Sequence, residues 1–176
     1  RGGGAYVAQA NEAGMALIMT WSSNIALSKR AGVQSAAFLG GQADKVVAYS
    51  SLTDAFDKTV KDLHPGVLVG LSRAGHLAPT QLCAARNAEG KDLVAVATQY
   101  NVCDGAAARI LNELLWDCSG SPLAKNEQYL EQAESTRIVN SATTLLLEKT
   151  LKQLNRDKQL QELQRSANVA ELRQVD

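Results

Sequence analysis

The stretch PGVLVGLSRAGHLAPTQLC, from Pro65 to Cys83, decides the predicted fold. Its segment GVLVGL is a short apolar run between glycines, which is typical of a buried β-strand. A second apolar run, TQLCAAR, follows Pro79, and a third, DLVAVATQY, follows the connection NAEGK. Because a short connection with glycine between two such runs indicates a β-hairpin, we predict an antiparallel meander here.

The same stretch contains a candidate nucleophile, Ser72, in the sequence GLSRAG of residues 70 to 75. This sequence is close to the G-x-S-x-G elbow of serine hydrolases, but alanine occupies the position two residues after the serine, where the elbow requires glycine. The hydrolase order also requires a histidine later in the chain, and none follows His76. We therefore predict no catalytic residue at this turn.

A second candidate site involves the same turn and a cysteine. If the hairpin is centred near Glu89 and Gly90, its register places His76 opposite Cys103, with imidazole near thiol. Ser72, His76 and Cys103 are therefore the candidate ligand-binding residues. The simpler interpretation is an exposed turn histidine and a buried structural cysteine.

Helical periodicity surrounds the predicted strands. Apolar residues recur at spacings of three and four over Tyr6 to Leu27, Leu52 to Leu63 and Gly105 to Cys118. Two further short strands are predicted at VQSAAFL, residues 33–39, and KVVAYSS, residues 45–51. The predicted fold class is α+β, with a small antiparallel sheet of three to five strands packed with helices.

The last third of the chain predicts a long C-terminal helical extension, because residues 123–176 contain neither glycine nor proline. We divide the chain into an α+β globular domain, 1–120, and the extension, 121–176. Its polar surface surrounds a thin apolar seam that includes Leu151, Leu154, Leu160 and Leu163. A helix of this kind is not stable alone, so we expect it to pack on its own domain or on another chain.

Charge and composition exclude several classes of function. Eighteen basic and eighteen acidic residues leave no net charge, and no basic stripe of the kind that binds nucleic acid occurs. The longest mostly apolar run, AGMALIMTW, is shorter than the roughly 20 residues of a membrane-spanning helix. The two histidines occur without HxH, HExxH or CxxC patterns, so we predict no metal site and no cofactor.

The three cysteines, Cys83, Cys103 and Cys118, bear on the compartment. Their odd number and their spacing favour reduced, buried thiols and a cytoplasmic location. The alternative is one disulfide and one free thiol in an oxidising compartment. The chain begins with Arg1 and not with methionine, so an exported protein with a removed signal peptide is the corresponding alternative.

These observations predict a non-enzymatic structural or assembly subunit whose partners are protein subunits in a homo- or hetero-oligomer. The predicted interface residues are Ile18 and Trp21 on a broad apolar N-terminal helix, together with Leu151, Leu154, Leu160 and Leu163 of the seam. One alternative is a small-molecule-binding or sensory α+β domain that uses Ser72, His76 and Cys103. The other alternative is a small thiol-dependent enzyme.

Overall fold

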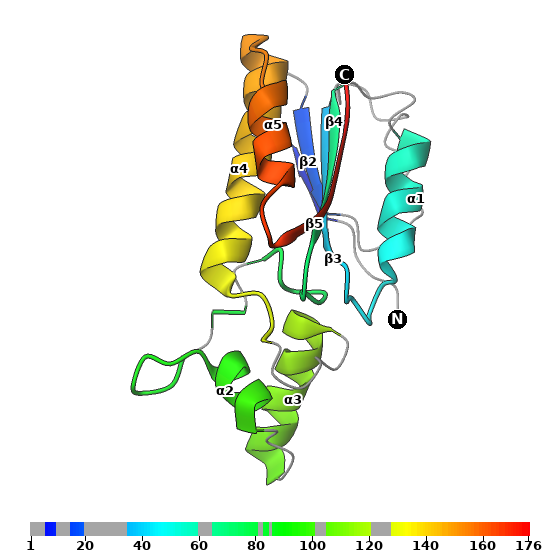
Figure 1. Ribbon diagram of the computed structural model, residues 1–176. Coiled ribbons are helices and arrows are strands. Elements are labelled where there is room, and N and C mark those ends of the chain that lie inside the picture. The colour runs from blue at the N-terminus through cyan, green and yellow to red at the C-terminus, as the bar shows by residue number, and fades with distance from the viewer. Residues whose placement is uncertain are drawn as a thin grey trace.

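The computed structural model describes residues 6–9, 15–19, 35–59, 65–80, 83–84, 86–100, 105–120 and 128–176. Its elements, in chain order, are β1 (Tyr6–Gln9), β2 (Met15–Met19), β3 (Ser35–Gly41), α1 (Tyr49–Thr59), β4 (Gly66–Leu71), α2 (Leu93–Tyr100), α3 (Gly105–Ser119), α4 (Gln132–Lys152), α5 (Asp157–Gln164) and β5 (Val169–Val175). The predicted α+β class is confirmed: a sheet is packed with helices, and a long helix, α4, follows in the last third of the chain (Figure 1).

The five strands form one mixed sheet in the order β1-β2-β3-β4-β5. The β1–β2 and β4–β5 pairs are antiparallel, whereas β2–β3 and β3–β4 are parallel. The predicted antiparallel meander is therefore corrected to a sheet with a parallel centre. The physical reason is the connection between β3 and β4, in which α1 carries the chain back to the starting edge, as a parallel pair requires.

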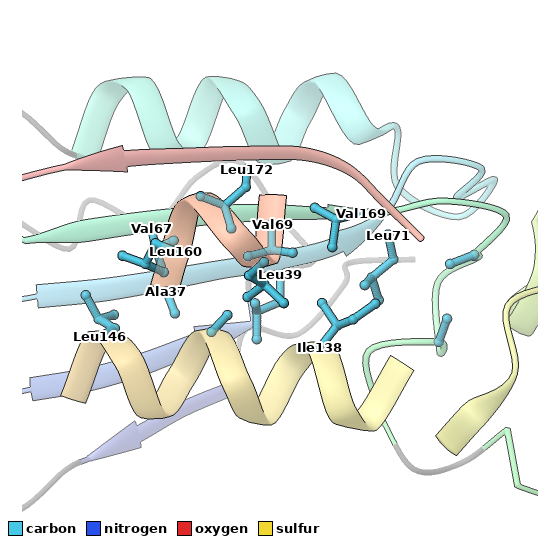
Figure 2. Close-up of a cluster of buried hydrophobic side chains, with 14 of the residues drawn as sticks. Ala37, Leu39, Val67, Val69, Leu71, Ile138, Leu146, Leu160, Val169 and Leu172 are labelled. Atoms are coloured by element: carbon cyan, nitrogen blue, oxygen red, sulfur yellow. The ribbon is translucent and has the colours of Figure 1, made fainter. Parts of the chain in front are cut away.

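The central strands β3 and β4 are buried on both faces, and their side chains alternate between two cores. On one face, Ala37, Leu39, Val67, Val69 and Leu71 join a cluster with residues of α4 and α5, namely Ile138, Ala142, Leu146, Leu160 and Leu163 (Figure 2). On the other face, Ala36, Phe38 and Leu68 pack against Leu52, Ala55 and Phe56 of α1. Burial on both faces explains why both strands are continuous apolar runs.

The helices α2 and α3 lie beyond one end of the sheet, away from the other helices (Figure 1). They share a small core in which Cys83, Val94, Cys118 and Tyr129 are buried. We call the described residues 83–84, 86–100 and 105–120 the α2–α3 lobe. Its core is separate from the two cores of the sheet.

Several predicted elements are confirmed by the structure. The described part of VQSAAFL, residues 35–39, lies in β3, GVLVGL forms β4, and the predicted helix from Gly105 is α3. The helix predicted from Leu52 is α1, which begins earlier, at Tyr49; residues 60–64 lie outside the described part. The expected C-terminal helices are present as α4 and α5.

Three predicted elements are wrong. The predicted N-terminal helix contains the strands β1 and β2, because a short apolar run such as MALIM fits a strand as well as a helix turn. The run KVVAYSS is a turn followed by the start of α1. The run DLVAVATQY is the helix α2, since Asp92 Oδ1 accepts hydrogen bonds from the N–H groups of Val94 and Ala95, as a helix N-cap does.

The run TQLCAAR also fails as a predicted strand. In its described part the backbone forms turns, and the one β-type contact is an isolated bridge between Arg86 and Asp92. The predicted hairpin about Glu89 is therefore a short turn before α2.

The C-terminal end of the chain returns to the sheet as β5, which was not predicted. Val169 and Leu172 are three residues apart, as in a helix, yet both pack in the core shared with α4 and α5. The pairing of β4 with β5 is irregular at this point, because Gly70 pairs with Glu171 but the next residue, Leu71, pairs with Val169. The extra residue in β5 lets two side chains three positions apart face the same side of the sheet. The predicted division at residue 120 remains a prediction, although this core combines residues from both sides of it.

Leucines of the predicted seam differ sharply in burial, which gives a test of the fold. Leu160→Ala removes a side chain that is 1% exposed and should lower the free energy of unfolding by about 2–5 kcal/mol. The matched change Leu154→Ala, at a position 39% exposed, should lower it by less than about 1 kcal/mol. Urea unfolding of both variants measures the difference; equal losses would contradict the packing of α5 on the sheet.

Candidate functional site

The candidate site lies where β3 and β4 end. Because these strands are parallel, their carboxyl ends meet at the same edge of the sheet. The turn after β3 carries Asp44 and the turn after β4 carries His76, and His76 Nδ1 donates to Asp44 Oδ2 at 2.8 Å. Open sheets with parallel strands commonly bind their ligands at this edge, so the residues here form the candidate functional site.

The turn after β3 holds the Asp44 carboxylate in a fixed position. Its second oxygen, Oδ1, accepts hydrogen bonds from the N–H groups of Val46 at 2.7 Å and Val47 at 2.9 Å. The side chain of Asp44 is 12% exposed and that of His76 is 8% exposed. The pair is therefore a largely buried, charge-assisted interaction between two loops far apart in the sequence.

The C-terminal end of α3 packs against the same turn. The N–H of Gly75 donates to Cys118 O and the N–H of Leu77 donates to Asp117 O, each at 2.6 Å. Burial raises the pKa of the Asp117 carboxyl, and the neighbouring His76 opposes this shift. Asp44, His76 and Asp117 thus form one polar cluster at the junction of the sheet with the α2–α3 lobe.

Two glycines allow the close approach of the loops at this junction. A Cβ on Gly41 would overlap the carbonyl group of Ala74, and a Cβ on Gly120 would overlap the carbonyl group of Ala43. Gly120 also has a φ of +78°, in the left-handed region that favours glycine. The junction is therefore closely packed backbone against backbone.

Little free space remains beside the polar cluster. The void lined by Asp44 and His76 has a volume of about 20 Å³, enough for about one water molecule. Small-molecule sites usually occupy about 300–1,000 Å³, so this junction does not offer room for a substrate. A groove of about 550 Å³ lies between α4 and α5, where Arg137, Asn140, Thr144 and Gln159 contribute polar side chains.

Two of the three predicted ligand-binding residues, Ser72 and His76, lie in the described turn after β4. Ser72 is half-buried, and its N–H donates to Asn168 O at 3.0 Å, just before β5. His76 is buried and bonded to Asp44, so the exposed, unbonded histidine of the simpler interpretation is corrected. Cys103 lies outside the described residues, so its predicted proximity to His76 remains a prediction.

Arg73, in the turn after β4, is bonded to the segments that precede α4 and β5. Arg73 has a φ of +51°, which is unusual for a residue with a Cβ. Its carbonyl accepts from the N–H of Leu130, and its guanidinium donates to Gln128 O at 3.2 Å and to Asn168 Oδ1 at 2.6 Å. These bonds stabilise the left-handed backbone at Arg73 and fix the start of the lobe connection.

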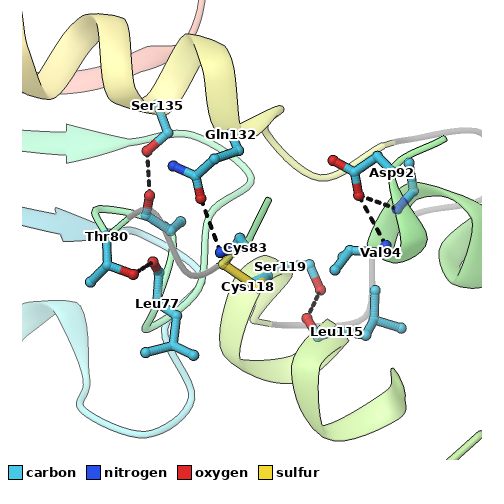
Figure 3. Close-up of a disulfide and its surroundings, with 12 residues drawn as sticks. Leu77, Thr80, Cys83, Asp92, Val94, Leu115, Cys118, Ser119, Gln132 and Ser135 are labelled. Atoms are coloured by element: carbon cyan, nitrogen blue, oxygen red, sulfur yellow. Dashed lines mark hydrogen bonds between the residues drawn. A yellow bond between two sulfur atoms is a disulfide. The ribbon is translucent and has the colours of Figure 1, made fainter. Parts of the chain in front are cut away.

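The cysteines differ from the prediction. Cys83 and Cys118 form a disulfide with a Cα–Cα distance of 5.8 Å (Figure 3). The expectation of reduced thiols is therefore corrected for this pair, and the alternative of one disulfide stands. The two cysteines meet because Cys83 follows the turn of His76, and the C-terminal end of α3 packs on that turn.

The disulfide closes a loop with a sequence separation of 35 residues that contains α2 and α3. The N–H of Cys83 donates to Gln132 Oε1 at 3.1 Å, and the hydroxyl of Ser135 donates to Ala78 O, so the start of α4 is bound to the same segment (Figure 3). Chain-entropy arguments for a loop of this length give a stabilisation of about 4 kcal/mol.

The predicted interface residues have different environments. Leu151 and Leu154 are 41% and 39% exposed, whereas Leu160 and Leu163 lie in the core of their own chain and are not available to a partner in this structure. Ile18 belongs to β2, not to a helix, and Trp21 lies outside the described residues. The exposed Ile110 and Trp116 on α3 were not among the interface residues predicted from the sequence.

Two other expectations concern what the described part of the chain contains. Within it, no three His, Cys, Asp or Glu side chains lie close enough together to bind a metal ion. No helix among the described residues has the length and apolar character needed to cross a membrane.

The polar cluster should contribute to stability. Asp44→Ala leaves the N–H groups of Val46 and Val47 and the imidazole of His76 without their acceptor, so we expect a loss of about 1–3 kcal/mol in the free energy of unfolding. The control is Asp54→Ala, which removes an exposed carboxylate on α1 and should change the free energy of unfolding by about 0.5 kcal/mol or less. Chemical denaturation that finds the two variants alike would contradict the role of Asp44.

Gly120 and Gly90 provide a second matched pair, because both have a positive φ but only Gly120 is in contact with a neighbouring loop. Gly90→Ala should lower the free energy of unfolding by about 1 kcal/mol, from backbone strain alone. Gly120→Ala adds the overlap with Ala43 and should cost at least about 2 kcal/mol more. Thermal and urea unfolding measure both; a smaller loss at Gly120 than at Gly90 would argue against the packed junction.

Comparison with family models, with curated proteins and with solved structures finds no match to this chain.

Proposed function

We propose that this protein is a non-enzymatic assembly subunit that pairs with a second copy of itself through α3. The observation that carries the proposal is the exposure of two large apolar side chains on this helix, Ile110 at 67% and Trp116 at 48%. Large exposed apolar and aromatic side chains are the residues that most often anchor protein interfaces.

These two side chains belong to a continuous helical surface. Five exposed residues recur at helical spacing on the side of α3 away from its buried cysteine: Ala106, Arg109, Ile110, Glu113 and Trp116. We call this surface the α3 face. The opposite side of α3 packs in the lobe core with Leu114, Leu115 and Cys118.

The α3 face is complementary to itself when two copies of α3 pair antiparallel about a two-fold axis. The axis crosses the helix at the level of Leu111, which is not itself part of the face. In this arrangement Arg109 of each copy lies opposite Glu113 of the other copy, and Trp116 lies opposite the small side chain of Ala106. Such mutual contacts are what a two-fold interface requires. The charge pair and the large-to-small pair both favour a second copy over an unrelated partner.

The charged residues are available for this exchange. Arg109 and Glu113 pair within α3 at 3.4 Å, but their side chains are 83% and 68% exposed. Exposed ion pairs of this kind contribute little to stability, so exchanging the partner within the helix for a partner across the interface has little cost.

The polar cluster at the sheet edge supports a non-enzymatic role. His76 and Asp44 are bonded to each other, and the void beside them holds about one water molecule. The buried pair joins the turns after β3 and β4 in a packed junction, whereas general acid–base catalysis requires a group within reach of a substrate.

Charge reversal tests this proposal directly. Arg109→Glu or Glu113→Arg places like charges opposite each other at the interface, so each should weaken dimerisation of the oxidised protein in sedimentation equilibrium. The double variant Arg109→Glu/Glu113→Arg restores both pairs and should restore the dimer. Trp116→Ala should raise the dimer Kd by roughly 30-fold or more, as the loss of an interface hot spot does.

The controls are Leu151→Ala and Leu154→Ala, which remove exposed apolar side chains at the end of α4 and should leave the Kd unchanged. A wild-type protein that stays monomeric up to millimolar concentration would contradict the proposal. So would a dimer that weakens in the α4 variants but not in the α3 variants, because its interface would then lie at the end of α4.

A further inference from the structure

We infer that the α2–α3 lobe is an oxidation-dependent folding unit, which acquires its packing only when Cys83 and Cys118 are joined. The sheet and its covering helices do not share this dependence. The consequence for assembly, that the α3 face is presented only by the oxidised chain, rests on the proposed function; the folding inference does not.

The lobe has a small apolar core of its own. Its cluster has four buried residues: Cys83, Val94 and Cys118 of the lobe, and Tyr129 from the segment before α4. Two of the four are the bridged cysteines. The remaining contacts come from partly buried side chains such as Leu114 and Leu115. Small units with so little buried apolar area usually need a disulfide or a metal to stay folded.

The sheet is supported without the lobe. Its two cores draw on β3, β4, β5, α1, α4 and α5, and neither cluster includes a residue of the described lobe. The first of these clusters alone has fifteen buried residues. Loss of the lobe packing therefore leaves both cores of the sheet in place.

The attachments of the lobe to the sheet lie next to the disulfide. They include the bond from Cys83 N–H to Gln132 Oε1 and the bonds from Gly75 and Leu77 N–H to the carbonyls of Cys118 and Asp117. Without the bridge, Cys83 and Cys118 are the ends of an open loop with a sequence separation of 35 residues. The eight-residue α2 is too short to be stable alone, and the fifteen-residue α3 is marginal.

Formation of the bond needs a two-electron oxidant. The thiols of Cys83 and Cys118 lose two protons and two electrons, and a disulfide-exchanging oxidant accepts them and becomes a dithiol. Once formed, the disulfide is shielded, because Cys83 is 2% and Cys118 is 0% exposed. Oxidation therefore belongs to folding rather than to a reversible switch, and the lobe is suited to an oxidising environment.

Hydrogen exchange of the full chain tests the inference. We compare the oxidised wild type with the variant Cys83→Ser/Cys118→Ser. In the double variant, amides of α2 and α3 should lose roughly 100-fold or more of their protection, which corresponds to opening a loop of this length. Amides of β3, β4 and α4, which lie outside the lobe, should keep theirs within a few-fold and serve as the internal control.

Two outcomes would overturn the inference: α2 and α3 keep their protection in the double variant, or β3, β4 and α4 lose theirs to the same extent. The exchange pattern compares the lobe with the sheet within one chain, and α2 lies outside the proposed α3 interface. A monomeric wild type with a protected lobe therefore contradicts the proposed function alone. A dimer that persists after the lobe has lost its protection contradicts the link between the two.

Discussion

Parallel strands must be joined by a crossover, and the pairing of β3 with β4 meets this requirement with α1 on one face of the sheet. The opposite face is then left for α4 and α5, which cover it (Figure 1). Because both strands end at the same edge, the turns that carry Asp44 and His76 become neighbours, although the residues are far apart in the sequence. The central parallel pair therefore positions the cores, the polar cluster and the point where the lobe attaches.

The lobe is attached at this edge by two kinds of interaction that act on the same segment. Hydrogen bonds link the turn after β4 with the carbonyls at the end of α3, and the bond between His76 and Asp44 holds this turn against the turn after β3. The covalent bond between Cys83 and Cys118 joins the two ends of the lobe close to those bonds. A lobe with a small core is in this way held by a stable sheet at one end while its exposed helix projects away from it (Figure 1).

Sequence reasoning succeeded where one physical effect dominated. GVLVGL is buried on both faces, and a short apolar run between glycines is then enough to predict β4. It failed where tertiary contacts override local pattern. The spacing of Val169 and Leu172 resembles a helix but fits a strand with an irregular register, and MALIM fits either element until the pairing of β2 with β1 and β3 is known.

The candidate site was less predictable than the fold, for a different reason. His76 was singled out, but its partner Asp44 lies on another loop, and no spacing in the sequence relates the two. The Asp92 cap before α2 was a local signal that favoured a helix over a strand, and the predicted hairpin failed because this signal was overlooked. The disulfide likewise depends on packing at the end of α3 that an odd number of cysteines does not predict.

The position of the α3 face has a physical rationale in this arrangement. An exposed tryptophan is of most use in binding when its backbone is already ordered, since association then has to immobilise less of the chain. Trp116 is two residues from the bridged Cys118, and the carbonyl of the intervening Asp117 is bonded to Leu77. The bonds that attach the lobe to the sheet therefore also order Trp116, the residue proposed to anchor the interface.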